Sequence, residues 1–263
     1  MFGFHWYGLI IGIGVLASIQ ASTWLARRRK IDEEMLWKAA WWVLIGGLIG
    51  ARTYHVLDLW PEIYSFDPIS ALYIWNGGLG IIGGLIGGFV GLLTYYKLKI
   101  ENCHAEHGPA LQDKLKITAK SLIDLAVFGL PLGQAIGRIG NFINQEVYGL
   151  PTNLPWGIFI DRENRRFHPL FAYEALWMLL GFGLMFLAEK TNKLKLIKKS
   201  YAGFYLVWYG LGRFWLDFLR PVEFVWQLNL TEGFVLNMAQ ASSLLMIAFG
   251  LGLLIHYCAE ERT

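Results

Sequence analysis

Charged residues are scarce in this chain. Asp, Glu, Lys and Arg make up 16% of its 263 residues, whereas 55% are hydrophobic, and a soluble domain carries about 25% charged residues. The mean hydropathy is +0.41. The net charge of +3 is spread over short loops and is not gathered in a basic patch. The composition therefore predicts a membrane protein and no nucleic-acid partner.

Metal-ligand cysteines, nucleotide-binding loops and a cleavable leader are also lacking. The two cysteines, Cys103 and Cys258, show neither metal-ligand spacing nor a disulfide framework. The glycine-rich stretch at 77–91 is followed by no Gly-Lys-Ser/Thr sequence, so it is not a phosphate-binding P-loop. The first apolar run has no charged n-region and no small-residue cleavage site, and we expect it to be an uncleaved membrane span.

Long apolar segments are what the chain has in place of charge. Several approach the roughly 20 residues that a helix needs to cross the hydrocarbon core of a bilayer. The predicted spans lie at 6–26, 36–57, 78–96, 121–137, 170–188, 202–219 and 235–257. We predict an all-α, polytopic integral membrane protein, with about seven transmembrane helices in a single transmembrane domain over residues 1–263.

The loop charges predict an orientation. Lys and Arg gather after the first, third and fifth predicted spans, at 27–30, 97–120 and 190–199, whereas 58–76 contains neither residue. Because positively charged loops stay in the cytoplasm, we expect the N-terminus outside and the C-terminus in the cytoplasm. The loop at 138–169 then faces the outside, where it is expected to form a small cap.

One strongly polar segment, residues 137–149, follows the fourth apolar run. It places Arg138, Asn141, Asn144 and Glu146 among three glycines. Ionisable groups at such depth are costly and usually mark a function. Arg138 and Glu146 could instead form a structural ion pair. Such a pair does not need two asparagines, so we favour a functional site.

The sixth predicted span carries a second polar stripe. Tyr209, Arg213 and Asp217 follow one another at intervals of four residues, which places them on one helix face. An Arg–Asp pair on one helix lowers the cost of both charges in lipid, and the stripe predicts a polar cleft. In the second span, Arg52 could either extend its charge to the interface or bind a lipid phosphate.

Three further features allow both structural and functional interpretations. Tyr7 lies in an aromatic group that would anchor the first span, or its hydroxyl could reach a lipid headgroup. The glycines from Gly80 to Gly91 favour close helix packing. The stretch from Asn76 to Gly80 could form a non-helical turn that lines a cavity. His168 could exchange a proton near neutral pH, although a single interfacial histidine is more often structural.

These residues carry a family resemblance. Residues 137–149 read Gly-Arg-Ile-Gly-Asn-Phe-Ile-Asn-Gln-Glu-Val-Tyr-Gly, which resembles the signature of the phosphatidylglycerol–prolipoprotein diacylglyceryl transferase family. The likeness covers nearly the whole chain in order. It extends through residues 5–8, Arg52, 75–84, Asp124, 168–169, 173–174, 209–220, Met238 and Gln240.

The resemblance implies an enzyme of the bacterial inner membrane, with its active site toward the outer leaflet. The family moves the diacylglyceryl group of phosphatidylglycerol to the lipobox cysteine in the signal peptide of a preprolipoprotein. A thioether forms and glycerol phosphate leaves. The implied partners are these two substrates and membrane lipids, and no metal or organic cofactor is implied.

The resemblance also implies roles for individual residues. Arg138 and Arg213 would hold the phosphate and stabilise the charge that develops on it as the C–O bond breaks. Asn141 and Glu146 would complete the catalytic group. The positions expected to bind substrate are Tyr7, Arg52, Asn76, Gly149, His168, Tyr209 and Asp217.

One departure from the family concerns proton removal. Many members have a histidine in the third span where this chain has Ile82, which cannot accept a proton. The substrate thiol could ionise unaided beside the two arginines. Alternatively, Glu146 or His168 could take its proton. A family member with lost or altered catalysis is therefore one alternative function.

The other alternative is a transporter or channel for an anionic solute. Arg52, Arg138 and Arg213 would then form its binding ring. Transporters often show inverted repeats with broken helices at matching positions, and the sequence shows no convincing pair of these. The charges also cluster toward the predicted outer leaflet and not at the midplane.

Overall fold

The computed structural model describes residues 6–74, 77–107, 119–221, 227–231 and 234–260. The chain forms two compact units. The first consists of residues 1–25 and 123–263, and the second of residues 26–122. The boundaries fall within two helices, near the end of α1 and near the start of α5. Each unit is described by itself below.

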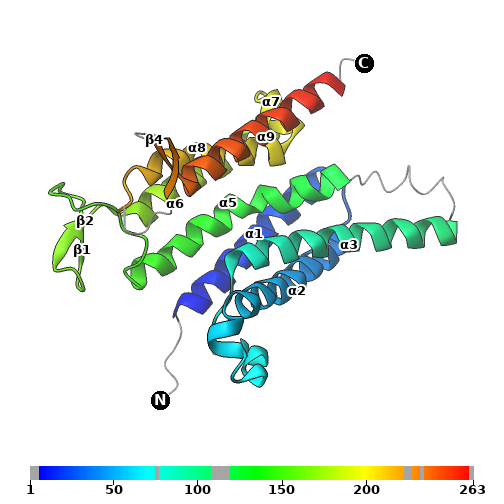
Figure 1. Ribbon diagram of the computed structural model, residues 1–263. Coiled ribbons are helices and arrows are strands. Elements are labelled where there is room, and N and C mark those ends of the chain that lie inside the picture. Colours follow the sequence, from blue (N-terminus) through cyan, green and yellow to red (C-terminus); the bar gives the residue numbers. More distant parts are fainter. Residues whose placement is uncertain (1–5, 75–76, 108–118, 222–226, 232–233, 261–263) are drawn as a thin grey trace. The chain divides into compact units, whose positions relative to one another are not determined.

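The first unit consists mainly of long helices (Figure 1). Two short antiparallel strand pairs, β1 with β2 and β3 with β4, extend from it. Its elements are α1 (Trp6–Arg28), α5 (Ala119–Ile143), β1 (Ile158–Ile160), β2 (Arg165–Phe167), α6 (Leu170–Thr191), α7 (Lys195–Lys199), α8 (Tyr201–Asp217), β3 (Gln227–Thr231), β4 (Phe234–Asn237) and α9 (Met238–Glu260).

Small residues let the helices of this unit approach closely. Helices α1 and α5 meet where the Ser18 hydroxyl donates to the Gly129 carbonyl at 2.9 Å. A Cβ on Gly129 would lie 2.1 Å from the Ser18 carbonyl oxygen, so a larger residue would separate the two backbones. Helices α8 and α9 meet in the same way at Gly203 and Gly250. This contact type is typical of helices packed in lipid.

Aromatic pairing fixes α6 against α8. The indoles of Trp177 and Trp208 stack with ring centroids 4.3 Å apart. Each indole N–H also donates to the other residue's carbonyl at 2.8 Å. Both polar edges are therefore satisfied while the rings are packed. This contact holds α6 and α8 side by side next to the site described below.

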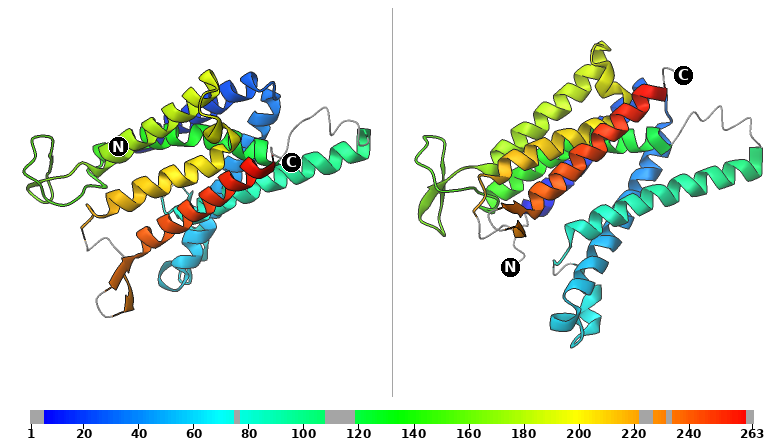
Figure 2. Two further views of the ribbon diagram at one scale, coloured as in Figure 1. Left: turned by 90° about the horizontal axis from the view of Figure 1, so that it is seen from above. Right: turned by 45° about the horizontal axis from the view of Figure 1, so that its top comes forward.

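The second unit is a pair of long helices with a compact turn region. Its elements are α2 (Glu33–Asp58), a π-helical turn (Trp60–Tyr64), a 3-10 turn (Pro68–Leu72) and α3 (Ile81–His107). Asp32 caps α2 by accepting from the Glu34 N–H at 3.0 Å. A Cβ on Gly50 would lie 2.3 Å from the Gly83 carbonyl oxygen. The predicted glycine stripe is therefore a helix contact, and α2 and α3 run side by side (Figure 2).

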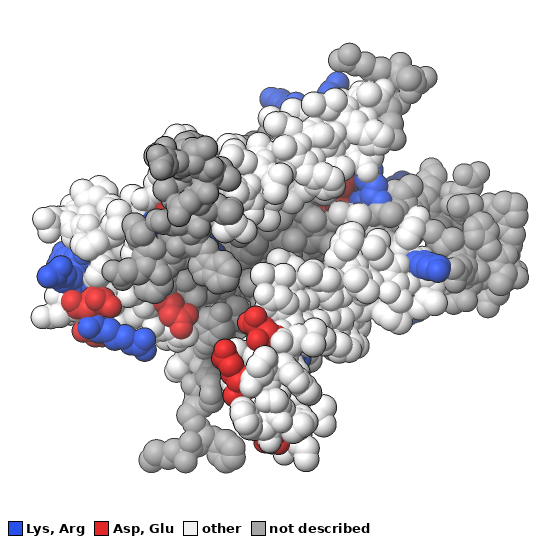
Figure 3. All heavy atoms as spheres, in the orientation of Figure 1, with Lys and Arg blue, Asp and Glu red and all other residues white. Residues whose placement is uncertain are grey.

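The apolar helix faces agree with a membrane protein. Large side chains such as Leu245 and Phe249 on α9 are exposed, and most of the described surface in Figure 3 is uncharged. Four of the described helices are long and apolar enough to cross a membrane: α1, α5 from Lys120, α6, and α9 up to Ala259. The other three predicted spans lie on α2, α3 and α8. That these three also cross the membrane stays a prediction.

The structure corrects three predicted boundaries. The expected outer loop at 138–169 begins later, because 138–143 are the last residues of α5. Residues 235–237 belong to β4, so the last long helix begins at Met238. Residues 78–80 precede α3 as a non-helical segment, and Gly77 and Gly78 adopt positive φ angles of 83° and 75°. The predicted non-helical turn is therefore confirmed at 77–80, and Asn76 lies outside the described residues.

Candidate active site

The end of α5 organises the first half of the site. Arg138 and Asn141 lie one turn apart, and Arg138 Nη1 donates to Asn141 Oδ1 at 3.2 Å. The chain then turns back after the helix, and the Glu146 N–H donates to the Asn141 carbonyl at 2.8 Å. The side-chain amides of Asn141 and Asn144 each donate to the Glu146 carboxylate at 3.4 Å. A chain of polar contacts thus connects Arg138 to Glu146.

The backbone around Glu146 is strained. Gln145 and Val147 have φ angles of 52° and 58°, in the left-handed region. A β-branched residue such as Val147 is rare there, because its branched side chain crowds the backbone. Such conformations cost about 1–3 kcal/mol and cluster at functional sites. The strained turn that holds Glu146 is therefore a candidate functional site.

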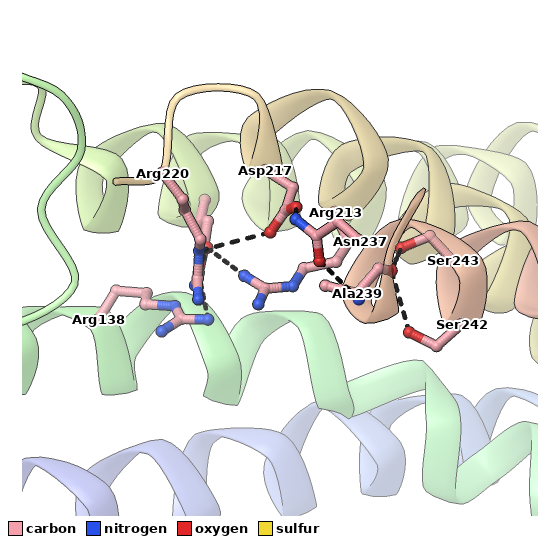
Figure 4. A network of polar contacts seen from close by, with 9 residues as sticks. Arg138, Arg213, Asp217, Arg220, Asn237, Ala239, Ser242 and Ser243 are labelled. Carbon is pink, nitrogen blue, oxygen red and sulfur yellow. Dashed lines mark hydrogen bonds and ion pairs between the residues drawn. The ribbon is translucent and has the colours of Figure 1, made fainter. Parts of the chain in front are cut away.

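Three arginines converge on one carboxylate in the second half of the site. Glu174 lies in the first turns of α6 and is only 6% exposed. Its carboxylate pairs with Arg138 Nη2, with Arg213 Nη1 at 3.3 Å and with Arg220 Nη2 at 3.4 Å. Figure 4 shows the three guanidinium groups pointing toward one another from α5, α8 and the segment after α8. We call Arg138, Arg213 and Arg220 the arginine cluster.

The arginine cluster is poorly hydrated and carries excess positive charge. The side chains of its members are 21–27% exposed. Burial lowers the pKa of the Arg220 guanidinium, and the nearby charge of Arg213 acts in the same direction. Glu174 and Asp217 oppose this change in the Arg220 pKa. Because one carboxylate is shared among three guanidinium groups, an added anion would be favourable here.

A small cavity of about 20 Å³ borders the cluster. Its lining includes Arg138, Arg213, Glu174, Tyr209 and Gln134. Among the described residues, the buried Gln134 Oε1 has no hydrogen-bond partner. A space of this size holds about one water molecule, which would satisfy that oxygen. The cavity thus places Tyr209 beside both arginines that the sequence predicts to hold the phosphate.

Two charge pairs considered from the sequence, one of them an alternative that was not favoured, are replaced by other pairs. The interpretation of Arg138 with Glu146 as a direct ion pair is wrong within the described contacts, because Arg138 pairs with Glu174 and reaches Glu146 through Asn141. The described contacts also give no ion pair between Arg213 and Asp217. Asp217 accepts from the Asn237 amide and lies 3.9 Å from Arg220 Nε. Arg213 turns to Glu174, since that carboxylate lies on the neighbouring helix α6.

Gly149 lies where three segments meet. Its N–H donates to the His168 carbonyl at 2.8 Å. A Cβ at this position would lie 2.7 Å from the Leu219 carbonyl oxygen and 3.0 Å from the His168 Cβ. Glycine is therefore required for the close approach, which joins the turn after α5 to the ends of β2 and α8.

His168 and Tyr7 lie beside the site. The His168 Nδ1 is 3.2 Å from the Tyr173 hydroxyl, and that hydroxyl also accepts from the Trp156 indole at 2.7 Å. Within the described residues, the His168 side chain makes no hydrogen bond to the arginine cluster. The Tyr7 ring packs against α5, because a Cβ on Gly140 would lie 2.7 Å from it.

Arg52 and Ile82 belong to the second unit. All five guanidinium N–H directions of Arg52 are used on backbone carbonyls. The acceptors are those of Ser70, Ala71, Tyr73, Gly77 and Gly78, at 2.7–3.3 Å. Arg52 therefore shapes the loop that leads into α3, a role that the sequence interpretation did not include. Ile82 lies in the first turn of α3 and is 50% exposed.

Sequence reasoning missed two central residues, Glu174 and Arg220. Each was visible as part of a polar group, since Glu174 follows His168 by six residues and Arg220 follows Asp217 by three. The absent signal was the pairing between helices. A carboxylate on α6 and an arginine on α5 are 36 positions apart, and no helical periodicity connects them.

Comparisons with known proteins identify the family. The family model described as "Prolipoprotein diacylglyceryl transferase" matches residues 1–256. Among similar proteins is the phosphatidylglycerol–prolipoprotein diacylglyceryl transferase of Nostoc sp., 37% identical over 98% of this chain and 87% of the relative. The protein of the same name from Synechococcus elongatus is 38% identical, over 96% of this chain and 83% of the relative.

A third relative with this name, from Prochlorococcus marinus, is 36% identical over 82% of this chain and 75% of its own length. The matched range contains the second compact unit, most of the first, and the positions of the arginine cluster. This chain belongs to the prolipoprotein diacylglyceryl transferase family.

Proposed function

We propose that this protein transfers the diacylglyceryl group of phosphatidylglycerol to the lipobox cysteine thiol of preprolipoproteins. The named relatives are diacylglyceryl transferases for these two substrates. The observation that carries the proposal is the convergence of three arginines, from separate segments, inside an apolar helical protein. Guanidinium groups bind phosphate oxygens with matched geometry.

Arg138 and Arg213 hold the lipid phosphate in the proposed reaction. The thiolate sulfur attacks the terminal glycerol carbon of the diacylglyceryl group, and the bond from that carbon to the phosphate oxygen breaks. The electron pair stays on the phosphate, so its negative charge rises as glycerol phosphate leaves. Both arginines stabilise this charge, and they act strongly because their side chains are only 27% and 21% exposed.

We propose that Glu146 accepts the proton of the substrate thiol. Its carboxylate is exposed and is connected to Arg138 through Asn141, so an incoming thiol could meet it near the phosphate site. His168 is the weaker choice, because its described side-chain hydrogen bond goes to Tyr173. Asn141 holds Arg138 and Glu146 in position by a hydrogen bond to each.

The remaining predicted positions surround this centre. Tyr209 lines the cavity beside the arginines, and Tyr7 packs against α5 at Gly140. Both tyrosines would contact the lipid. Gly149 and Asp217 would support the site, Gly149 through close packing and Asp217 through Arg220. Substrate contacts of Arg52, Asn76 and His168 remain proposals from the resemblance.

We infer the membrane arrangement from the loop charges. Seven spans in the bacterial inner membrane would place the N-terminus outside, the C-terminus in the cytoplasm and the segment 144–169 on the outer side as a small cap. The site would then face the outer leaflet, where phosphatidylglycerol and an exported signal peptide meet. Reporter fusions within 58–76 and 190–199 test this, and activity of a periplasmic reporter at 190–199 would overturn it.

The function itself is tested by product formation. Purified protein in detergent is incubated with phosphatidylglycerol and a lipobox peptide, and the diacylglyceryl-thioether mass is measured. We expect product from the unmodified protein and a loss of at least about 100-fold with Arg138→Ala. No product from the unmodified protein, in an assay where a characterised relative is active, would refute the proposed function.

The proton assignment needs a separate measurement. Glu146→Gln should lower the rate near neutral pH, and the rate should recover as the pH approaches the thiol pKa of about 8.5. The thiolate then forms without help. His168→Gln should leave this pH profile unchanged. If His168→Gln alters the pH dependence of the rate and Glu146→Gln does not, His168 is the residue that removes the thiol proton.

A further inference from the structure

Glu174 has no role in the proposed reaction, although it is the centre of the site. It is an anion enclosed by the three arginines. It forms an ion pair with Arg138 and accepts hydrogen bonds from Arg213 and Arg220. Two of these arginines are the ones assigned to the lipid phosphate. In the absence of lipid, the phosphate-binding groups are therefore already occupied by an anion that belongs to the protein.

Carboxylate and phosphate compete for the same guanidinium geometry. Both accept parallel hydrogen bonds from the fork of an arginine. Arg138 uses Nη2 for Glu174 and Nη1 for Asn141. A phosphate that contacts Arg138 and Arg213 together must therefore approach the space that the Glu174 carboxylate fills. The adjoining cavity, about 20 Å³, is too small for a phosphate unless this carboxylate moves.

We propose that Glu174 is an internal stand-in for the lipid phosphate, and that it gives up its contacts with Arg138 and Arg213 when the phosphate binds. This inference rests on the proposed function. In the resting protein, the carboxylate keeps three like charges together that would otherwise repel one another. When the phosphate enters, it takes over the pairing with Arg138 and Arg213, and the Glu174 carboxylate keeps Arg220 as its partner. Glu174 acts on the phosphate through the arginines and is therefore a positioning residue.

The stand-in also bears on product release. The lipid phosphate is a diester with one negative charge, whereas glycerol phosphate is a monoester with a second pKa of about 6 and nearly two charges. The arginines would hold this product more strongly than the substrate. Return of the Glu174 carboxylate to the arginines supplies a competing anion that helps glycerol phosphate to leave. A side chain at position 174 that competes less well for the arginines should therefore slow the release of glycerol phosphate.

The test measures binding of glycerol phosphate by calorimetry to the purified full chain in detergent. Glu174→Gln keeps the size of the side chain and removes its charge. We expect Glu174→Gln to bind glycerol phosphate at least about fivefold more tightly than the unmodified protein. Removing one negative charge that competes for partly buried arginines has an effect of this size. Product inhibition in the transferase assay should strengthen by the same factor.

A second variant keeps the test valid if Glu174→Gln does not fold. Glu174→Asp keeps the charge, but its shorter side chain cannot reach all three arginines equally well, so its affinity for glycerol phosphate should lie between those of the unmodified protein and Glu174→Gln. If Glu174→Gln does not fold, this variant alone decides. A purely structural role predicts weaker binding in both variants. Weaker or unchanged binding in the folded variants would overturn the proposal.

Helix α6 offers a matched control. Glu189 is also buried, at 4% exposure, and it accepts from the Tyr201 hydroxyl at 2.6 Å. It lies 15 positions after Glu174, about 22 Å along the helix. Glu189→Gln should leave glycerol phosphate binding unchanged. If the unmodified protein forms no thioether, the proposed function fails; if it does and Glu174→Gln binds no more tightly, this inference alone fails.

Discussion

Replacing Arg138 with lysine separates the charge of this residue from its shape. Arg138 holds two partners with two different nitrogens, Glu174 through Nη2 and Asn141 through Nη1 at 3.2 Å. Lysine keeps the positive charge, but its single ammonium group cannot span both partners. Arg138→Lys should therefore leave the phosphate attracted to the site and break the link from the arginine cluster to Glu146.

The size of the effect follows from the hydrogen bond that lysine cannot make. One hydrogen bond to a charged group contributes about 1.5–3 kcal/mol. If the missing hydrogen bond acts in the transition state, kcat/KM should fall roughly 10- to 150-fold. Overall stability should change little, because Glu174 keeps Arg213 and Arg220 as partners. Arg138→Ala also removes the charge, and its activity should fall further than that of Arg138→Lys.

The assay is steady-state thioether formation with phosphatidylglycerol as the varied substrate. We expect kcat to carry most of the decrease for Arg138→Lys, since the missing hydrogen bond matters most as charge develops. The control is Arg165→Lys, which makes the same change at an exposed residue of β2 and should leave both constants unchanged. A rise in KM with unchanged kcat would refute the reasoning, because it would make Arg138 a simple attractor of the lipid.

Three other predictions follow from single positions. Gly149→Ala should lower the free energy of unfolding by about 1–3 kcal/mol, measured by thermal unfolding in detergent, because its Cβ would lie 2.7 Å from the Leu219 carbonyl oxygen. Arg52→Lys should open the loop at 70–78 to proteolysis and hydrogen exchange, because one ammonium cannot replace contacts with five carbonyls. Ile82→His should raise kcat about tenfold or more near neutral pH by adding a second base to Glu146, whereas Ile86→His, one turn further along α3, should not.

Each of these changes has a result that would contradict it. Gly183→Ala has no atom within 4 Å of the added Cβ, so it should be neutral or slightly stabilising; equal destabilisation by both glycine variants would refute the packing argument. Unchanged cleavage of the loop in Arg52→Lys would show that other contacts hold it. An Ile82→His enzyme no faster than the unmodified one would show that Glu146 removes the thiol proton well enough alone.

The helices were predictable from sequence because they depend on local properties. An apolar run of sufficient length forms a helix in a membrane whatever its neighbours are, and each of the seven predicted spans overlaps a long helix. The polar signature at 137–149 was equally visible, since its composition differs from everything around it. The close packing of the glycine stripe on α3 followed from spacing, although its partner α2 did not.

The pairing of charges was not predictable, because it depends on which helices are neighbours. Spacing on one helix suggested a pair of Arg213 with Asp217, yet the structure gives Arg213 to Glu174 on α6 and Asp217 to Asn237 at the start of α9. A guanidinium group pairs with the carboxylate that packing brings within reach, and sequence periodicity contains no information about that choice. The same reasoning explains why Arg220 and Glu174 were left out of the predicted site.

The location of these groups bears on the missing histidine. Arg138, Arg213, Arg220, Glu174 and Glu146 all lie in the first compact unit, whereas Ile82 lies in the second. The groups that would bind the phosphate and balance its charge therefore do not include the position where this chain departs from the family. Removing the thiol proton and stabilising the leaving phosphate are then separate tasks. The replacement of histidine by isoleucine should slow the first and leave glycerol phosphate binding unaffected.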